Sequence, residues 1–76
     1  MENKKATFDD IMNEVKKYMV KPENIDLITR AYEFANKMHE GQHRKSGEPY
    51  VIHVIQVGYI LATLHCGPQT IAAGLL

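Results

Sequence analysis

Residues 49–76 read PYVIHVIQVGYILATLHCGPQTIAAGLL and contain no Asp, Glu, Lys or Arg. All nine basic and all nine acidic side chains of the chain lie at or before Glu48. A long uncharged run is typical of a membrane-spanning helix, which needs about 20 apolar residues. Here Gly67 and Pro68 interrupt the run and leave only residues 51–64, which are too few. We therefore expect a buried core helix and no membrane segment.

The size and charge of the chain narrow its function further. Its 76 residues suffice for one small domain, and the formal net charge is zero. A DNA-binding chain would carry an excess of basic residues, so no DNA partner is expected. Residues 1–7 are charged without an apolar run behind them, which argues against a secretory signal. Cys66 is the single cysteine, and a chain without cysteine pairs is compatible with a cytoplasmic location.

The spacing of apolar residues predicts an all-α fold of three to four helices, because alternating strand patterns are weak. The first helix is expected to begin after Thr7, which forms a capping-box pattern with Asp10, and to end near Val20. For the second helix, Asn24 is the expected N-cap and Gly41 the expected stop.

The second half of the chain contains a polar loop followed by two further helices. Residues 41–49 carry no apolar side chain apart from the final proline, which predicts an exposed loop. The third helix is expected from near Pro49 to about His65, and its apolar residues cover most of its circumference, so it should be central. A fourth helix is expected to open at Gln69 and Thr70.

The segment from His39 to His43 matches the H-E-x-x-H pattern of zinc peptidases, in which two histidines on one helix bind zinc. That chemistry needs continuous helix under both histidines, whereas Gly41 favours a helix end at this place. A zinc peptidase is therefore the weakest of three functional hypotheses, and solvated residues at a helix end are the simpler interpretation.

His53 lies on the same stripe of the third helix as Val57, Ile60 and Leu64, so we expect its imidazole to be buried. A buried histidine is either a hydrogen-bonded core residue or a metal ligand, and spacing alone favours the core residue. His65 could not share a metal with it, because twelve residues of helix separate them by about 18 Å.

Arg44, Lys45 and Ser46 form the third candidate site. Two adjacent cations and a hydroxyl, followed by Gly47 and a helix start, suit a phosphorylated ligand, and a guanidinium can also stack on a base. The alternative is an ordinary solvated loop.

Taken together, residues 31–76 closely resemble the start of the hydrolase domain of the RelA/SpoT homologue family, which makes and degrades the alarmone (p)ppGpp. The pattern H-x-G-Q-x-R-K-S-G-E-P-Y-x-x-H is present in full from His39 to His53. Two positions depart from the family's usual residues. Val54 replaces the proline that usually follows the histidine, and Gly74 replaces an alanine, at about 1 kcal/mol of helix propensity.

The resemblance implies an all-α, HD-type metal hydrolase domain that removes the 3′-pyrophosphate of (p)ppGpp and yields GDP or GTP. It implies that His53 is a ligand for Mn²⁺, which would activate a water molecule. It also implies that Arg44 contacts the guanine and that Lys45 and Ser46 lie along the nucleotide site. The family includes bifunctional enzymes of the stringent response that are also GTP pyrophosphokinases.

In this family a His-Asp pair and an acidic motif follow directly after the two leucines that match Leu75 and Leu76. We therefore expect residues 1–76 to be the N-terminal part of a (p)ppGpp hydrolase domain, cut before the His-Asp motif. Such a fragment would have no complete catalytic set, no activity and no specific Mn²⁺ affinity of its own. Its third and fourth helices would bind the remainder of the domain or self-associate. The alternative is a helical regulatory or interaction module that binds another chain through its third helix.

Overall fold

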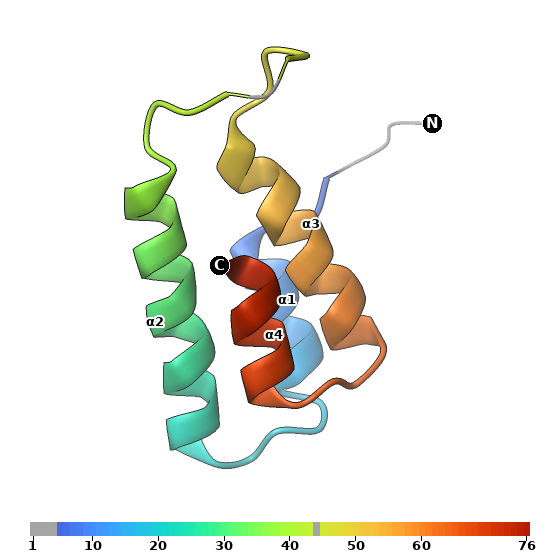
Figure 1. Ribbon diagram of the computed structural model, residues 1–76. Coiled ribbons are helices and arrows are strands. Elements are labelled where there is room, and N and C mark those ends of the chain that lie inside the picture. The colour runs from blue at the N-terminus through green and yellow to red at the C-terminus, as the bar shows by residue number, and fades with distance from the viewer. Residues whose placement is uncertain (1–4, 44) are drawn as a thin grey trace.

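The computed structural model describes residues 5–43 and 45–76, which form a small all-α arrangement (Figure 1). The described helices are α1 (Phe8–Val15), α2 (Pro22–Met38), α3 (Tyr50–Thr63) and α4 (Pro68–Leu75). Helix α4 packs against both α2 and α3, whereas α1 packs against α3 and, less extensively, against α2. The all-α prediction is confirmed. None of the described helices is long and apolar enough to cross a membrane.

The start of α1 is the capping box that the sequence predicted. The Thr7 hydroxyl accepts from the Asp10 N–H at 3.3 Å, and the Asp10 carboxylate accepts from the Thr7 N–H at 2.8 Å. The expected end near Val20 is wrong, because α1 stops at Val15. Residues 16–18 form a turn in which the N–H groups of Lys17 and Tyr18 donate to the third preceding residues, Glu14 and Val15, and this tighter turn leads the chain out of the helix.

Helix α2 begins three residues before the position expected from the sequence. Lys21 is its N-cap and makes no capping hydrogen bond through its side chain. The prediction that Asn24 caps this helix is wrong, because Pro22 takes the first helical position, where its fixed φ suits the helix. The helix ends at Met38, and Gly41 follows with a φ of +78°, so the stop predicted there is confirmed within a few residues.

The loop and the last two helices agree closely with the expectations. The described residues of 41–49 are exposed except for the half-buried Glu48. Pro49 is the N-cap of α3 rather than part of its first turn, and α3 ends at Thr63, close to the expected His65. Pro68 opens α4, one residue before the expected start.

Apolar side chains from all four helices form one core. Its buried members are Ile11, Val15, Met19, Ile28, Ala31, Ile55, Ala62, Ile71, Ala72 and Leu75. Helices α1, α3 and α4 meet at Gly58. A Cβ atom at this position would lie 2.9 Å from the Leu75 Cδ2 atom and 3.2 Å from the Ile11 Cδ1 atom. Because both neighbours are fully buried, the contact requires glycine.

Gly58→Ala is therefore expected to destabilise the fold although alanine is the better helix former. Overpacking costs about 1–3 kcal/mol, which exceeds the gain in helix propensity of about 1 kcal/mol. Gly74→Ala is the matched control, because its new Cβ would meet chiefly the Cδ1 atom of the half-buried Leu61, which can rotate away. Urea unfolding should show a loss for Gly58→Ala that exceeds the control's by about 1 kcal/mol. Equal effects would contradict this packing.

The carboxyl end of α3 is held by the turn that follows α1. His65 has a φ of +57°, and the N–H groups of His65 and Cys66 donate to the Ala62 and Leu61 carbonyls, which completes a Schellman motif. The Tyr18 ring stacks on His65 at 4.4 Å between ring centroids, and its hydroxyl donates to the Cys66 carbonyl at 2.7 Å. Burial raises the pKa of this Tyr18 hydroxyl.

Helix α3 is central on one side only. Its buried residues Val54, Ile55, Gly58 and Ala62 face α1 and the core, whereas Ile60 is 57% exposed and Leu64 is 69% exposed. The prediction that the stripe through His53 is buried is wrong, because His53 lies on this outer side and is half-buried. The neighbouring helices pack against a different side of α3, so the stripe through His53 is not the side that they bury.

Candidate functional site

The loop between α2 and α3 closes on itself. The Tyr50 N–H donates to the Gln42 carbonyl at 3.0 Å, and His43 and Pro49 form an isolated antiparallel β-bridge. The two ends of the segment 43–49 therefore lie side by side, and residues 45–48 project from the helical body as a loop.

The loop presents two of the predicted nucleotide-binding residues beside the start of α3. Lys45 and Ser46, with His43 and Tyr50, line an open surface hollow of about 540 Å³. Arg44, the third predicted residue, lies outside the residues that the structure describes. The hollow thus combines an ammonium group, a hydroxyl group and an aromatic ring, which suit a phosphorylated ligand with a planar base.

His53, the predicted metal ligand, lies one helical turn beyond Tyr50 on α3. The rings of the two residues meet edge to face, with 6.1 Å between their centroids. Tyr50 therefore connects the hollow at Lys45 and Ser46 to the imidazole, and the structure places these predicted site residues in one region. Tyr50 belongs to the sequence motif that carries Lys45 and Ser46, but no role was predicted for it from the sequence.

A second aromatic contact ties this region to α2. The His39 and Tyr50 ring centroids lie 4.5 Å apart, and the His39 Nδ1 atom lies 3.0 Å from the Gln42 Oε1 atom. Gln42 also donates through Nε2 to the Met38 carbonyl at 3.3 Å. Several residues of the motif therefore have a local structural role, because they fix how the loop leaves α2 and enters α3.

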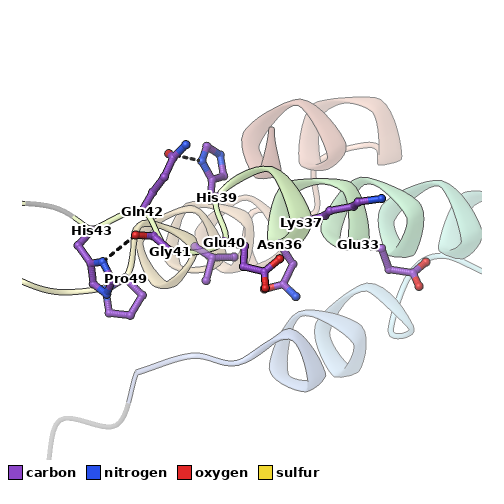
Figure 2. Close-up of a pocket in the computed structure, with 10 residues that line it drawn as sticks. Glu33, Asn36, Lys37, His39, Glu40, Gly41, Gln42, His43 and Pro49 are labelled. Carbon is purple, nitrogen blue, oxygen red and sulfur yellow. Dashed lines mark hydrogen bonds between the residues drawn. The ribbon is translucent and has the colours of Figure 1, made fainter.

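The H-E-x-x-H segment does not have zinc-peptidase geometry. Helix α2 ends at Met38, so residues 39–43 are not continuous helix. Figure 2 shows His39 and His43 around a surface pocket of about 440 Å³, each turned to a different local partner. His39 pairs with Gln42, whereas the His43 Nδ1 atom lies 3.1 Å from the Gly41 carbonyl oxygen. The requirement of the zinc-peptidase hypothesis for a helix at this place is contradicted.

The ligand set of a metal site is not assembled within the part of the chain that the structure describes. No three His, Cys, Asp or Glu side chains gather there. Of the predicted ligands, these residues supply only His53, so they do not by themselves fit a metal ion.

Comparison with known proteins gives this geometry a context. The model of the HD domain family matches residues 31–76, which is more than half of the chain. The chain belongs to the HD domain family. This family has an all-α fold of metal-dependent hydrolases, as the sequence analysis predicted for the fold.

The relatives of this HD domain confirm the resemblance to RelA/SpoT homologues. A guanosine-3′,5′-bis(diphosphate) 3′-pyrophosphohydrolase of Vibrio cholerae is 39% identical over 69 residues, which are 91% of this chain and 10% of the relative. The Spiroplasma citri protein of the same name is 36% identical over 69 residues, 91% of this chain and 9% of its own. A GTP pyrophosphokinase of Myxococcus xanthus is 40% identical over 75 residues, 93% of this chain and 10% of its own. The chain thus spans about a tenth of the length of these relatives.

Proposed function

We propose that residues 1–76 form the N-terminal part of an HD domain that removes the 3′-pyrophosphate of (p)ppGpp and yields GDP or GTP and pyrophosphate. One observation carries this proposal. Lys45 and Ser46 line a hollow together with Tyr50, whose ring contacts that of His53. The names of the relatives from Vibrio cholerae and Spiroplasma citri support the substrate class.

The roles of the individual residues in this proposal follow from their chemistry. Lys45 and Ser46 donate hydrogen bonds to phosphate oxygens, which are charge-assisted because the phosphate is ionised, and Arg44 stacks on or hydrogen-bonds to the guanine. In the complete domain, His53 would be one of several ligands that hold Mn²⁺, and the ion would supply a Lewis acid and lower the pKa of a water molecule. We further propose a cytoplasmic location, where a chain with a single cysteine stays reduced.

Nucleotide binding can be tested in a chimera in which residues 1–76 replace the matching N-terminal segment of the Vibrio cholerae relative. Lys45→Ala is expected to weaken the affinity for ppGpp by about tenfold or more, because a hydrogen bond to a charged group is lost. Lys37→Ala is the matched control, since Lys37 is also an exposed lysine but lies on α2, outside the hollow. Calorimetric titration with ppGpp measures both. Equal affinities of the two variants would contradict the proposed phosphate contact.

We also propose that the outer face of α3, defined by Ile60 and Leu64, is covered by another protein surface. In the isolated 76-residue chain the cover is a second copy, and in a complete HD domain it is the rest of the domain. Both side chains are mostly exposed, and α3 and α4 carry no charged residue that would favour solvent.

Self-association of the isolated chain has a direct test. Sedimentation should show a mass that rises with concentration, and Leu64→Glu should shift the chain toward the monomer by placing a charge in the contact. Thr63→Glu is the control at a neighbouring exposed position. A wild-type chain that remains a folded monomer at all concentrations would contradict this proposal.

A further inference from the structure

Gln56 on α3 makes an unusual pair of hydrogen bonds with the segment that precedes α1. Its Oε1 atom accepts from the Ala6 N–H at 3.1 Å, and its Nε2 atom donates to the Ala6 carbonyl at 2.8 Å. One side-chain amide thus satisfies both backbone polar groups of a residue 50 positions away, as a neighbouring β-strand would. This pairing fixes the backbone of Ala6 alongside α3.

The residues on either side of Ala6 are anchored as well. Thr7 is the N-cap of α1, so the segment continues directly into the helical body. On the other side, the Lys5 ammonium group pairs with the Glu48 carboxylate. Glu48 lies in the α2–α3 loop two residues after Ser46, and its side chain is only 25% exposed. Residues 5–7 therefore run from α1 along α3 to the loop of the proposed nucleotide site.

The ends of the loop are held by the His43–Pro49 bridge, but its backbone is permissive at Gly47. Gly47, next to Glu48, has a φ of +90°, and a Cβ atom there would meet no other atom within 4 Å. Packing therefore does not fix the loop at this glycine. The Lys5–Glu48 ion pair is partly exposed, and such a pair contributes little when both side chains must first be ordered. By fixing Ala6, Gln56 removes part of that entropic cost.

We propose that Gln56 is a positioning residue that orders the loop bearing Lys45 and Ser46, acting through Ala6 and the Lys5–Glu48 ion pair. Only the identity of the ligand that the ordered loop binds rests on the proposed function. Because the coupling itself does not require a nucleotide, it can be measured in the free protein.

The first test uses the 76-residue chain and the variant Gln56→Met, which keeps the length of the side chain but removes both hydrogen bonds. Gln69→Met, in the exposed first turn of α4, is the matched control. NMR relaxation should show that the order parameters of residues 45–48 fall from about 0.85 toward 0.6 in Gln56→Met only. The Ala6 N–H should also exchange at least about tenfold faster. A rigid loop in folded Gln56→Met would overturn the proposal.

A second set of variants changes only residues outside the buried core, so its result does not depend on whether a core substitution still folds. Lys5→Glu and Glu48→Lys should each loosen residues 45–48, and the double variant should restore their order, because it restores the ion pair in reverse. This rescue tests the step through the Lys5–Glu48 ion pair, whereas Gln56→Met tests the step through Ala6. Failure of the double variant to restore order would overturn the coupling through Lys5 and Glu48.

Titration of the chimera, with and without Gln56→Met, with ppGpp then separates the two proposals. If the loop loosens and the affinity for ppGpp falls about three- to tenfold in Gln56→Met, both are supported. If the loop loosens but the otherwise unsubstituted chimera shows no binding, the coupling is supported and the proposed function is contradicted. If ppGpp binds equally well to the chimera with and without Gln56→Met, the positioning role is overturned and the proposed function stands.

Discussion

Replacing Leu75 by alanine is expected to lower the free energy of unfolding by about 2–5 kcal/mol, the range for large-to-small changes at fully buried leucines. Leu75 is 0% exposed and packs against Gly58 and Ile11, where α4, α3 and α1 meet. Little relaxation is available there, because Gly58 belongs to a helix backbone and Ile11 is itself fully buried. A domain of this size has only about 0.05–0.15 kcal/mol of stability per residue, so the loss is a large fraction of the total.

The neighbouring residue provides a control for this prediction. Leu76 follows Leu75 directly but is 61% exposed. Leu76→Ala should therefore change the free energy of unfolding by no more than about 0.5 kcal/mol. Denaturant unfolding followed by circular dichroism measures both variants. Similar losses for the two leucines would contradict the packing of α4 described above.

The second large effect concerns His53. In the chimera with the Vibrio cholerae relative, His53→Ala is expected to reduce release of pyrophosphate from ppGpp at least about a hundredfold. Loss of groups that only orient a metal ligand already costs about 10- to 100-fold, and His53 is proposed to be a ligand itself. Excess Mn²⁺ should recover part of the activity, because the remaining ligands bind the ion more weakly.

The control for His53 lies at the other end of the same helix. His65→Asn keeps a residue that tolerates a positive φ and removes the imidazole that stacks on Tyr18. Its effect should appear in stability and not in the dependence of the rate on Mn²⁺. If both variants lose activity equally, or if His53→Ala keeps the wild-type Mn²⁺ dependence, His53 is not a metal ligand.

Local chemistry made several structural features predictable from the sequence. The capping box at Thr7 and Asp10 and the glycine stop at Gly41 depend on neighbouring residues alone, and the structure has both. The N-cap predicted at Asn24 was wrong for an equally local reason, because Pro22 offered an earlier start. Such features need no knowledge of which helices pack together.

The burial of His53 depends on tertiary packing, which the sequence pattern could not supply. Helix α3 is apolar on most of its circumference, so its hydrophobic pattern does not specify which side faces the core. That choice is made by the contact of Gly58 with α1 and α4 and of Leu61 with α4. These contacts leave His53 on the outer side with Ile60 and Leu64.

The candidate site could be predicted where its residues are neighbours in the sequence motif. It could not be predicted where residues distant in the sequence come together in the fold. The pattern around Lys45 and Ser46 indicated a phosphate-binding loop, and the structure places both beside one hollow. Gln56 had no comparable signal, because a single polar residue in an apolar helix reveals no partner 50 residues away. Its pairing with Ala6 follows only from how residues 5–7 lie along α3.

Pyrophosphate release is the most direct test that this chain belongs to a (p)ppGpp hydrolase. The chimera of residues 1–76 with the remainder of the Vibrio cholerae relative should be assayed with ppGpp and Mn²⁺. We predict Mn²⁺-dependent release of pyrophosphate within about tenfold of the unmodified relative's rate, a difference of about 1.4 kcal/mol in activation free energy. A folded chimera that binds ppGpp but releases no pyrophosphate would contradict the proposed function.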